Sequence, residues 1–157
     1  MKKNRNKLYI GLFIVFLMVS STIGFLYSSE DSKKVNGNKF TLTDKGWQLY
    51  SGGNYWYFDY LPSELNFESD MRTISNLVYV SVLDNQYFYE ISNKFALLGV
   101  VVERVSLEEI DCDTEITTLV FMYENDNKIY KEGSCVYFEG REDMLIDKLF
   151  YEMLGVI

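Results

Sequence analysis

The chain has 157 residues, with 15 Lys and Arg against 23 Asp and Glu, 2 Cys and no His. This length suits a single domain. The lack of His excludes Ser-His and Cys-His nucleophiles and His-ligated metals. The acidic balance argues against nucleic-acid binding, because such binding depends on neutralising phosphates. Carboxylate, thiol, tyrosine and lysine chemistry remain.

An apolar segment of uncharged residues, 8–27, follows a basic tail at residues 1–7. At about 1.5 Å per residue, this segment spans the roughly 30 Å hydrocarbon core of a membrane. The basic tail predicts that the N-terminus is cytoplasmic and that the chain after residue 27 lies outside. We therefore expect a single-pass transmembrane helix, a signal anchor in the cell membrane. A cleaved signal peptide is the alternative, because Thr22-Ile23-Gly24 has the small-x-small pattern of a cleavage site.

Residues 28–38 are polar and short of apolar side chains, which predicts a stalk. Residues 39–157 then form one extracytoplasmic domain of ordinary size. Without the four basic residues of the tail, 11 basic residues stand against 23 acidic ones, a net charge of −12. The domain outside the membrane is therefore strongly acidic.

The first third of the domain is predicted to be β structure. Phe40 and Leu42 alternate with threonines, as expected for a strand with one buried face. Strands at 47–50 and 55–60 flank Gly52-Gly53-Asn54, whose residues tolerate positive φ, and this arrangement predicts a hairpin. Pro62 ends the ladder, and residues 63–75 fit either a short helix or irregular chain.

A strand, a helix and a strand follow. Residues 77–82 and 100–105 are rich in β-branched side chains and predict buried strands. Between them, Asp84 or Asn85 can cap a helix with apolar positions Phe88, Ile91, Phe95 and Leu98, and Gly99 ends it. This unit predicts a β-α-β crossover with parallel strands.

The rest of the chain completes an α+β domain with a mixed sheet. Residues 117–123 and 128–131 flank a polar loop at 125–127 and predict a hairpin. A short strand is expected at 135–138. Residues 141–154 have an apolar face and end at Gly155, which predicts a C-terminal helix.

From residue 76 the order of elements is strand, helix, strand, strand, strand, helix, and this order resembles the core of a thioredoxin-like domain. That family places Cys-x-x-Cys where the first helix begins, but this chain has Asp84-Asn85-Gln86-Tyr87 there. The family also places a Pro ahead of the third strand, where this chain has Ile116-Thr117. The resemblance therefore implies a topology without the redox chemistry.

A second resemblance covers more of the chain. It is carried by the basic N-terminal anchor, both cysteines, and scattered residues of the first and last parts of the domain: Gly46-Trp47, Tyr50, Phe58, Pro62, Glu64-Leu65 and the ending Asp147–Ile157. These features are similar to small uncharacterised membrane-anchored archaeal proteins. The resemblance implies a retained anchor and no particular activity.

Cys112 and Cys135 lie outside the membrane in this topology, where oxidising conditions permit a disulfide between them. Two buried free thiols, or a reactive or metal-binding thiol, are the alternatives. The flanking carboxylates of Asp111 and Asp113 disfavour the thiolate form that a nucleophile needs.

The acidic loop 108–115 has carboxylates at the spacing that opens an EF-hand, but Ile116 and Met122 occupy the positions of its turn glycine and final Glu. A solvated loop is therefore expected, with weak divalent-cation binding as the alternative. The sequence indicates no dedicated metal site and no cofactor.

The hairpin is unusually rich in aromatic residues. Neighbouring residues of a strand point to opposite faces, so Tyr55 and Tyr57 share a side with Asp59, while Trp56 lies on the other side. Burying the Asp59 carboxylate without a partner would be costly, so the side that carries it is expected to face solvent. We expect Tyr55 and Tyr57, with Tyr50 across the turn, to bind a partner and Trp56 to lie in the core. The alternatives are that a helix or the membrane surface covers the second face.

The sequence lacks a nucleophile elbow and a Gly-rich phosphate loop. It therefore favours a membrane-tethered, non-catalytic module that binds an unknown protein, peptide or sugar. The alternative is an extracytoplasmic enzyme, either a degenerate thioredoxin-like protein or a carboxylate-based hydrolase.

Overall fold

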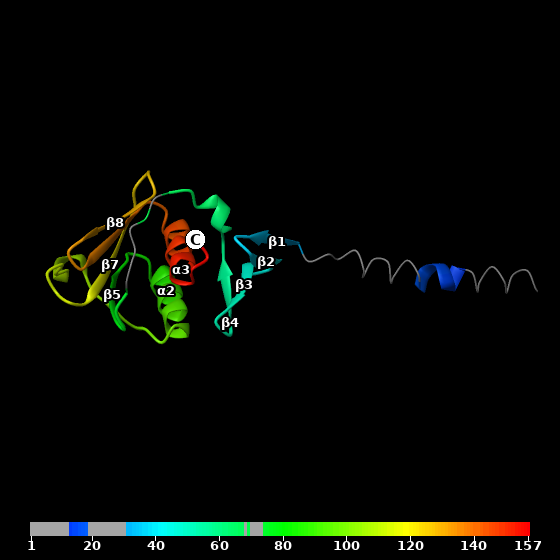
Figure 1. The fold of residues 1–157 in the computed structure, drawn as a ribbon, viewed down its shortest axis with the longest axis horizontal. Helices are drawn as coiled ribbons and strands as arrows, with labels where there is room; N and C mark the ends of the chain where they lie inside the picture. The colour runs from blue at the N-terminus through cyan, green and yellow to red at the C-terminus, as the bar shows by residue number, and fades with distance from the viewer. Residues whose placement is uncertain (1–12, 19–30, 68, 70–73) are drawn as a thin grey trace, which may run out of the picture. The chain divides into compact units, whose positions relative to one another are not determined.

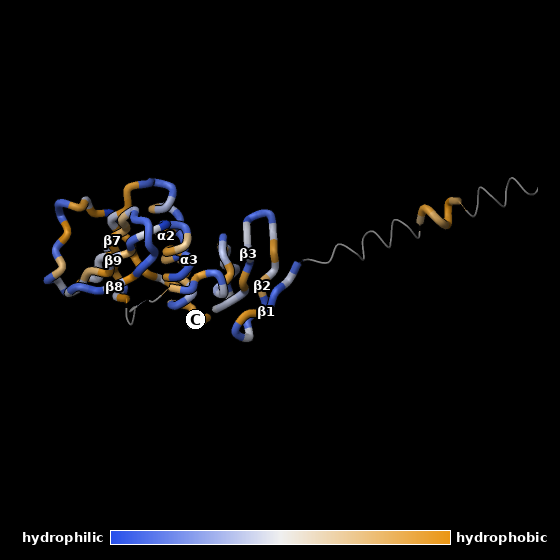
Figure 2. The backbone as a smooth tube through the Cα atoms, turned by 90° about the horizontal axis from the view of Figure 1, so that it is seen from above, coloured by the Kyte–Doolittle hydropathy of each residue, from blue (hydrophilic) through white to orange (hydrophobic). Residues whose placement is uncertain are grey.

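The structure is a computed structural model that describes residues 13–18, 31–67, 69 and 74–157. The chain divides into two compact units, Met1–Ser32 and Lys33–Ile157. In the first unit, residues 13–18 are helical and apolar throughout (Figure 2). The rest of the predicted anchor at residues 8–27 lies outside the described residues. None of the helices in the described part of the chain is long and apolar enough to cross a membrane.

The first sheet, which we call sheet A, has four strands in chain order: β1 (Ser32–Val35), β2 (Asn38–Thr43), β3 (Gly46–Ser51) and β4 (Asn54–Phe58). β3 is antiparallel to both β2 and β4, and the predicted hairpin is confirmed. Gly52 and Gly53 form its two-residue turn with φ of 60° and 84°, which glycine adopts without steric cost.

β1 lies inside the segment 28–38 that was predicted to be a stalk. Ordered structure therefore begins before the predicted boundary at residue 39. After β1, the Asn36 side-chain amide donates a 3.0 Å hydrogen bond to the Val156 carbonyl, which ties this turn to the end of the chain. The strand has lysines at an exposed sheet edge, so it has no alternating apolar pattern from which a sequence could reveal it.

The second sheet, sheet B, contains β5 (Leu77–Ser81), β6 (Val101–Arg104), β7 (Thr117–Met122), β8 (Lys128–Glu132) and β9 (Cys135–Glu139). Their order across the sheet is β6-β5-β7-β9-β8. β5 is parallel to β6 and β7, and β7 is parallel to β9, whereas β8 is antiparallel to β9. The predicted crossover and the mixed sheet are both confirmed.

The predicted hairpin between residues 117–123 and 128–131 is wrong. β9 lies between β7 and β8, and β8 forms its hairpin with β9 instead. The decisive local signal is the two-residue turn Gly133-Ser134, in which Gly133 has a φ of 59°. A two-residue turn with a glycine favours a tight hairpin more strongly than the longer loop at 125–127 does.

Helices α2 (Asn85–Leu97) and α3 (Glu142–Met153) lie between the two sheets (Figure 1). The Asp84 carboxylate accepts a 2.7 Å hydrogen bond from the Gln86 amide and caps α2, as the sequence predicts. Gly99 and Gly155 follow the two helix ends with φ of 74° and 68°. Short 3-10 turns occur at Pro62–Glu64 and Leu107–Glu109.

Aromatic rings connect sheet A with the helix layer. Tyr151 of α3 stacks on Phe58 with ring centroids 3.9 Å apart, and Phe150 lies 6.1 Å from Trp56. Phe150 also contacts Phe95 of α2 at 5.0 Å. All five rings are almost fully buried. The position of the hairpin relative to the helices is therefore fixed by core packing.

Candidate functional site

The two faces of the β3–β4 hairpin differ as predicted. Trp56 is 2% exposed on the face that meets the helices, whereas Tyr50 and Tyr55 on the opposite face are 62% and 58% exposed. Tyr57 lies on the same outer face and is half-buried. In the part of the chain that the structure describes, the helices meet the Trp56 face of sheet A, and the alternative in which a helix covers the tyrosines is wrong.

Tyr50, Tyr55 and Tyr57 form one surface, which we call the tyrosine face. Tyr50 and Tyr55 are directly opposite each other on β3 and β4, and their ring centroids are 5.0 Å apart. The Tyr57 hydroxyl accepts a 2.9 Å hydrogen bond from the Gln48 amide, and the Lys45 ammonium lies 5.5 Å from the Tyr57 ring centroid. These contacts hold the rings in place while they are exposed to solvent.

A cleft of about 300 Å³ opens beside Tyr57, between the end of β4 and α2. Lysines and carboxylates line it in equal number: Lys45, Lys94, Asp59 and Glu90. Glu90 and Lys94 form an ion pair at 2.7 Å along α2. Charged side chains therefore line the cleft, in contrast to the aromatic rings of the tyrosine face next to it.

Asp147 of α3 is the most deeply buried carboxylate near this cleft, at 1% exposure. One of its oxygens accepts a 3.1 Å bond from the Lys94 ammonium, and the other accepts the backbone amides of Asp59 and Tyr60 at 2.7 Å and 2.9 Å. Burial raises the pKa of Asp147 to about 6, although the Lys94 charge and the Tyr60 amide act in the opposite direction. Both oxygens are occupied, so this carboxylate fixes the end of β4.

Tyr60, which follows β4, is held by hydrogen bonds to side chains at the start and the end of α3. Its hydroxyl donates a 3.0 Å bond to Asp143 and accepts a 2.6 Å bond from Arg141, and its carbonyl accepts a 2.7 Å bond from the Tyr151 hydroxyl. Burial and the hydrogen bond to Asp143 raise the pKa of Tyr60. These contacts attach the end of the hairpin to the start of α3.

The sequence interpretation missed the Lys94–Asp147 pair. Lys94 is three residues after Ile91, which places it on the apolar stripe of α2. A lysine within such a stripe is the sequence pattern that could have predicted its burial. Asp147 is not on the predicted apolar face of α3. Its burial is a consequence of the way in which sheet A packs against the helices.

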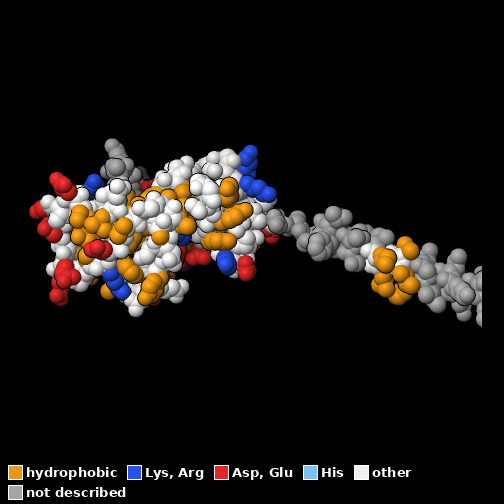
Figure 3. Space-filling model, turned by 90° about the horizontal axis from the view of Figure 1, so that it is seen from below, with side chains coloured by type: hydrophobic (Ala, Val, Ile, Leu, Met, Phe, Trp, Pro, Cys, Tyr) orange, Lys and Arg blue, Asp and Glu red, His pale blue; other side chains and the backbone are white. Residues whose placement is uncertain are grey.

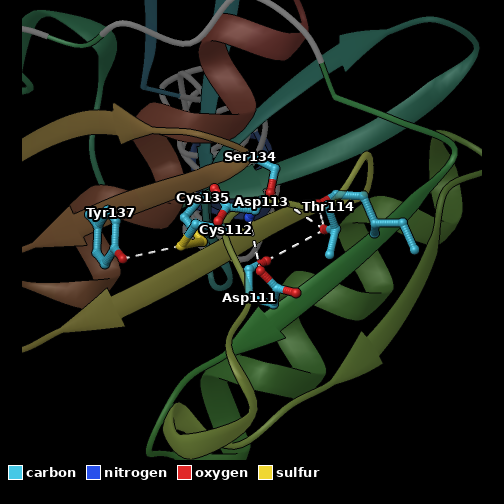
Figure 4. The surroundings of a disulfide bond; sticks show 8 residues. Asp111, Cys112, Asp113, Thr114, Ser134, Cys135 and Tyr137 are labelled. Carbon is cyan, nitrogen blue, oxygen red and sulfur yellow. Dashed lines mark hydrogen bonds between the residues drawn. A yellow bond between two sulfur atoms is a disulfide. The ribbon is translucent and has the colours of Figure 1, made fainter.

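Cys112 and Cys135 have their sulfurs at bonding distance, 2.00 Å, as the sequence predicts for a disulfide (Figure 4). Cys135 is fully buried in β9, and Cys112 belongs to the acidic loop. The Ser134 amide also donates a 2.8 Å bond to the Cys112 carbonyl. A side chain at Gly133 would lie 2.2 Å from that carbonyl, so the glycine permits the close approach of the loop.

A second aromatic surface lies on the outer side of sheet B, and the sequence did not indicate it. Tyr130 and Tyr137 stack with ring centroids 5.1 Å apart. The Tyr130 hydroxyl donates a 2.7 Å bond to Glu139, and this bond together with burial raises the pKa of Tyr130 to about 12. Glu139 also pairs with Lys128 at 2.5 Å. A carboxylate therefore holds the Tyr130 hydroxyl in place, whereas Tyr50 and Tyr55 contact each other through their rings.

Charge is distributed unevenly over the domain. Residues 33–60, which include most of sheet A, contain four lysines and two acidic residues, whereas residues 61–157 contain seven basic and nineteen acidic residues. Acidic side chains stand out at the sheet B end of the face in Figure 3. The tyrosine face therefore belongs to the less acidic part of the domain.

Within the described residues, no group of three or more Asp, Glu, Cys or His side chains is arranged to hold a metal ion. Comparisons with protein-family models, curated proteins and solved structures find no match to this chain. The two family resemblances noted in the sequence therefore stay predictions.

Proposed function

We propose that this chain is a membrane-tethered binding module that presents its tyrosine face outside the cytoplasm. Residues 8–27 are the single-pass anchor in this proposal, and residues 1–7 are cytoplasmic. The observation that carries the proposal is the cross-strand pair Tyr50 and Tyr55, two large rings that are 62% and 58% exposed. Tyrosine supplies a large contact area at a low cost in side-chain entropy, and it is enriched in binding surfaces.

The chemistry of the tyrosine face limits its partners to classes that fit exposed aromatic rings with polar neighbours. The two rings, inclined by 53° to each other, offer aromatic contact area, and the neighbouring Gln48 amide and Lys45 ammonium offer polar contacts. A protein segment, a peptide or a sugar ring has the matching combination of apolar and polar groups. These are the partner classes that we propose.

The alternative is an extracytoplasmic enzyme of the degenerate thioredoxin-like or carboxylate-hydrolase type. It would need a reactive thiol or an accessible carboxylate with a shifted pKa. Cys112 and Cys135 are joined to each other, and the buried Asp147 uses both oxygens to bind Lys94 and two amides. The geometry therefore gives more support to binding than to either kind of catalysis.

Site-directed photocrosslinking in intact cells tests this proposal. A benzophenone amino acid in place of Tyr50 should capture a defined partner, which is identified by the mass of the adduct, whether polypeptide or sugar. The matched control is the same substitution at Tyr123, which is 72% exposed on the loop after β7. Identical adducts at both positions, or none at position 50, would contradict the proposal.

A further inference from the structure

The side of β4 that faces away from β3 is unpaired: in the part of the chain that the structure describes, β4 is the last strand of sheet A. Ser51 and Asn54 flank the two-glycine turn and form a hydrogen-bonded pair, so the backbone groups of Trp56 also face β3. Tyr55 and Tyr57 alternate with these residues. Their N–H and C=O groups therefore face outward along a free strand edge.

β4 differs from the other edge strands of the two sheets. Proteins protect a free edge from pairing by placing charged side chains along it. The other edge strands, β1, β6 and β8, all carry such charges: Lys33 and Lys34, Glu103 and Arg104, and Lys128, Lys131 and Glu132 respectively. β4 has the sequence Asn-Tyr-Trp-Tyr-Phe and carries no charge. Its edge is therefore open to another strand.

The open edge is short because Asp147 closes one end of it. The backbone amide of Asp59 points away from β3, as do the amides of Tyr55 and Tyr57. It donates a 2.7 Å hydrogen bond to the Asp147 carboxylate. A pairing strand can therefore reach the backbone of Tyr55 and Tyr57 but not that of Asp59. This confines the contact to the segment Tyr55-Trp56-Tyr57.

We propose that the occupant of this edge is β4 of a second copy of the chain, so that the two copies of sheet A form one continuous sheet. The segment Tyr55-Trp56-Tyr57 reads the same in both directions. A two-fold axis perpendicular to the sheet, midway between the Trp56 residues of the two copies, places Tyr55 of each copy opposite Tyr57 of the other. The outward N–H and C=O groups of these residues then bond to each other as in any antiparallel pair.

The side chains of β4 are compatible with this axis. The Trp56 indole donates a 3.1 Å hydrogen bond to the Ser51 carbonyl, which turns it toward the hairpin turn and away from the free edge. On the outer face, Tyr57 of the second copy extends the pair of Tyr50 and Tyr55 into a row of three rings. The second copy thus enlarges the tyrosine face that we propose as the binding surface. The proposed dimer therefore rests on the proposed function and extends it.

The membrane anchor explains how so short an edge can support a dimer. A contact confined to three residues of each strand buries much less than the roughly 1,200 Å² of a stable interface between free proteins. Two copies that are tethered to one membrane meet at a high effective concentration, which strengthens a weak contact. We therefore expect the pairing in the full-length, membrane-bound chain.

Disulfide trapping with mixed variants tests the register directly. Opposite residues of a hydrogen-bonded antiparallel pair have Cα atoms about 5.5 Å apart, which suits a disulfide. Two differently tagged full-length chains, one carrying Tyr55→Cys and the other Tyr57→Cys, are expressed together and oxidised. The native Cys112 and Cys135 are already joined, so each variant has a single free thiol. We expect a mixed dimer that contains both tags.

Each variant expressed alone is the matched control. Like residues are offset along the strands in the proposed register, so neither variant should give the dimer by itself. Equal yields in all three samples, or a disulfide to a different polypeptide, would overturn the proposal. The wild-type chain reconstituted into lipid vesicles keeps the shared membrane and needs no substitution in the domain. Single-molecule photobleaching should count two chains per spot; one chain per spot at every protein-to-lipid ratio would also refute the pairing. Membrane and soluble fractions are scored separately, so a failure of the tether is distinguished from a failure of the pairing.

Discussion

The division of the hairpin into a core face and a binding face predicts opposite effects for two neighbouring residues. Trp56→Ala removes an indole that is 2% exposed, together with its 3.1 Å hydrogen bond to the Ser51 carbonyl and its packing against Phe150. Replacing a buried aromatic residue by Ala costs about 3–5 kcal/mol of unfolding free energy. For a domain of this size, that loss lowers the melting temperature by roughly 10–25 °C.

Tyr57→Ala removes a ring on the outer face, whose contacts are a hydrogen bond with Gln48 and the Lys45 ammonium. Contacts of this kind on a solvated surface contribute less than about 1 kcal/mol. We therefore expect the melting temperature of this variant to stay within a few degrees of the wild type while photocrosslinking from position 50 is weakened.

Urea and thermal unfolding of the full-length chain in detergent, followed by circular dichroism with the disulfide intact, measures both losses. Trp56→Phe is a useful intermediate, because it keeps a ring but removes the indole donor, and it should cost about 1–3 kcal/mol. If Trp56→Ala leaves stability unchanged, or if Tyr57→Ala unfolds the domain, the assignment of the two faces is refuted.

Three further predictions concern other parts of the chain. Replacing Cys112 and Cys135 by Ser should lower the unfolding free energy by about 3 kcal/mol, measured by urea titration; an unchanged midpoint would contradict a stabilising disulfide. Because burial raises the pKa of Asp147 to about 6, the folded protein holds this proton more tightly than the unfolded chain does. The resulting stability, about 3 kcal/mol, is complete below about pH 4 and lost as the pH rises to 6, so the stability of wild type relative to Asp147→Asn should fall across this range rather than stay constant. Protease added to intact cells should digest residues 28–157, whereas full protection would exclude the proposed topology.

The elements that the sequence predicted well are those whose pattern is local. The spacing of Phe88, Ile91 and Phe95 defines one stripe of α2, and Asp84 and Gly99 mark its ends, so both the helix and its limits follow from neighbouring residues. The alternation along β4 likewise separates the tyrosines from Trp56, because the strand period is two residues. Neither prediction depends on contacts with distant parts of the chain.

The features that the sequence did not predict depend on distant contacts or on weak patterns. The insertion of β9 between β7 and β8 is a choice among strand partners, and Phe121 stacks on Phe138 at 4.4 Å across that pairing. The Lys94–Asp147 pair joins two helices that meet only in the folded domain. β1 has a single apolar residue, Val35, so its sequence shows no apolar alternation and its strand character comes from its place at the edge of sheet A.

Asp147 connects the stability of the core with the extent of the open edge. Its carboxylate is buried beside Lys94 and simultaneously removes the Asp59 amide from the free side of β4. Loss of this carboxylate would leave the buried Lys94 without its partner on α3, and it would also lengthen the edge that another strand can reach. The side chains of Tyr55 and Tyr57 lie on the far face of the same strand, outside this network. Alternate side chains of β4 point to opposite faces, one toward the core and one toward solvent. Substitutions of Tyr55 and Tyr57 can therefore change binding and pairing without changing the core.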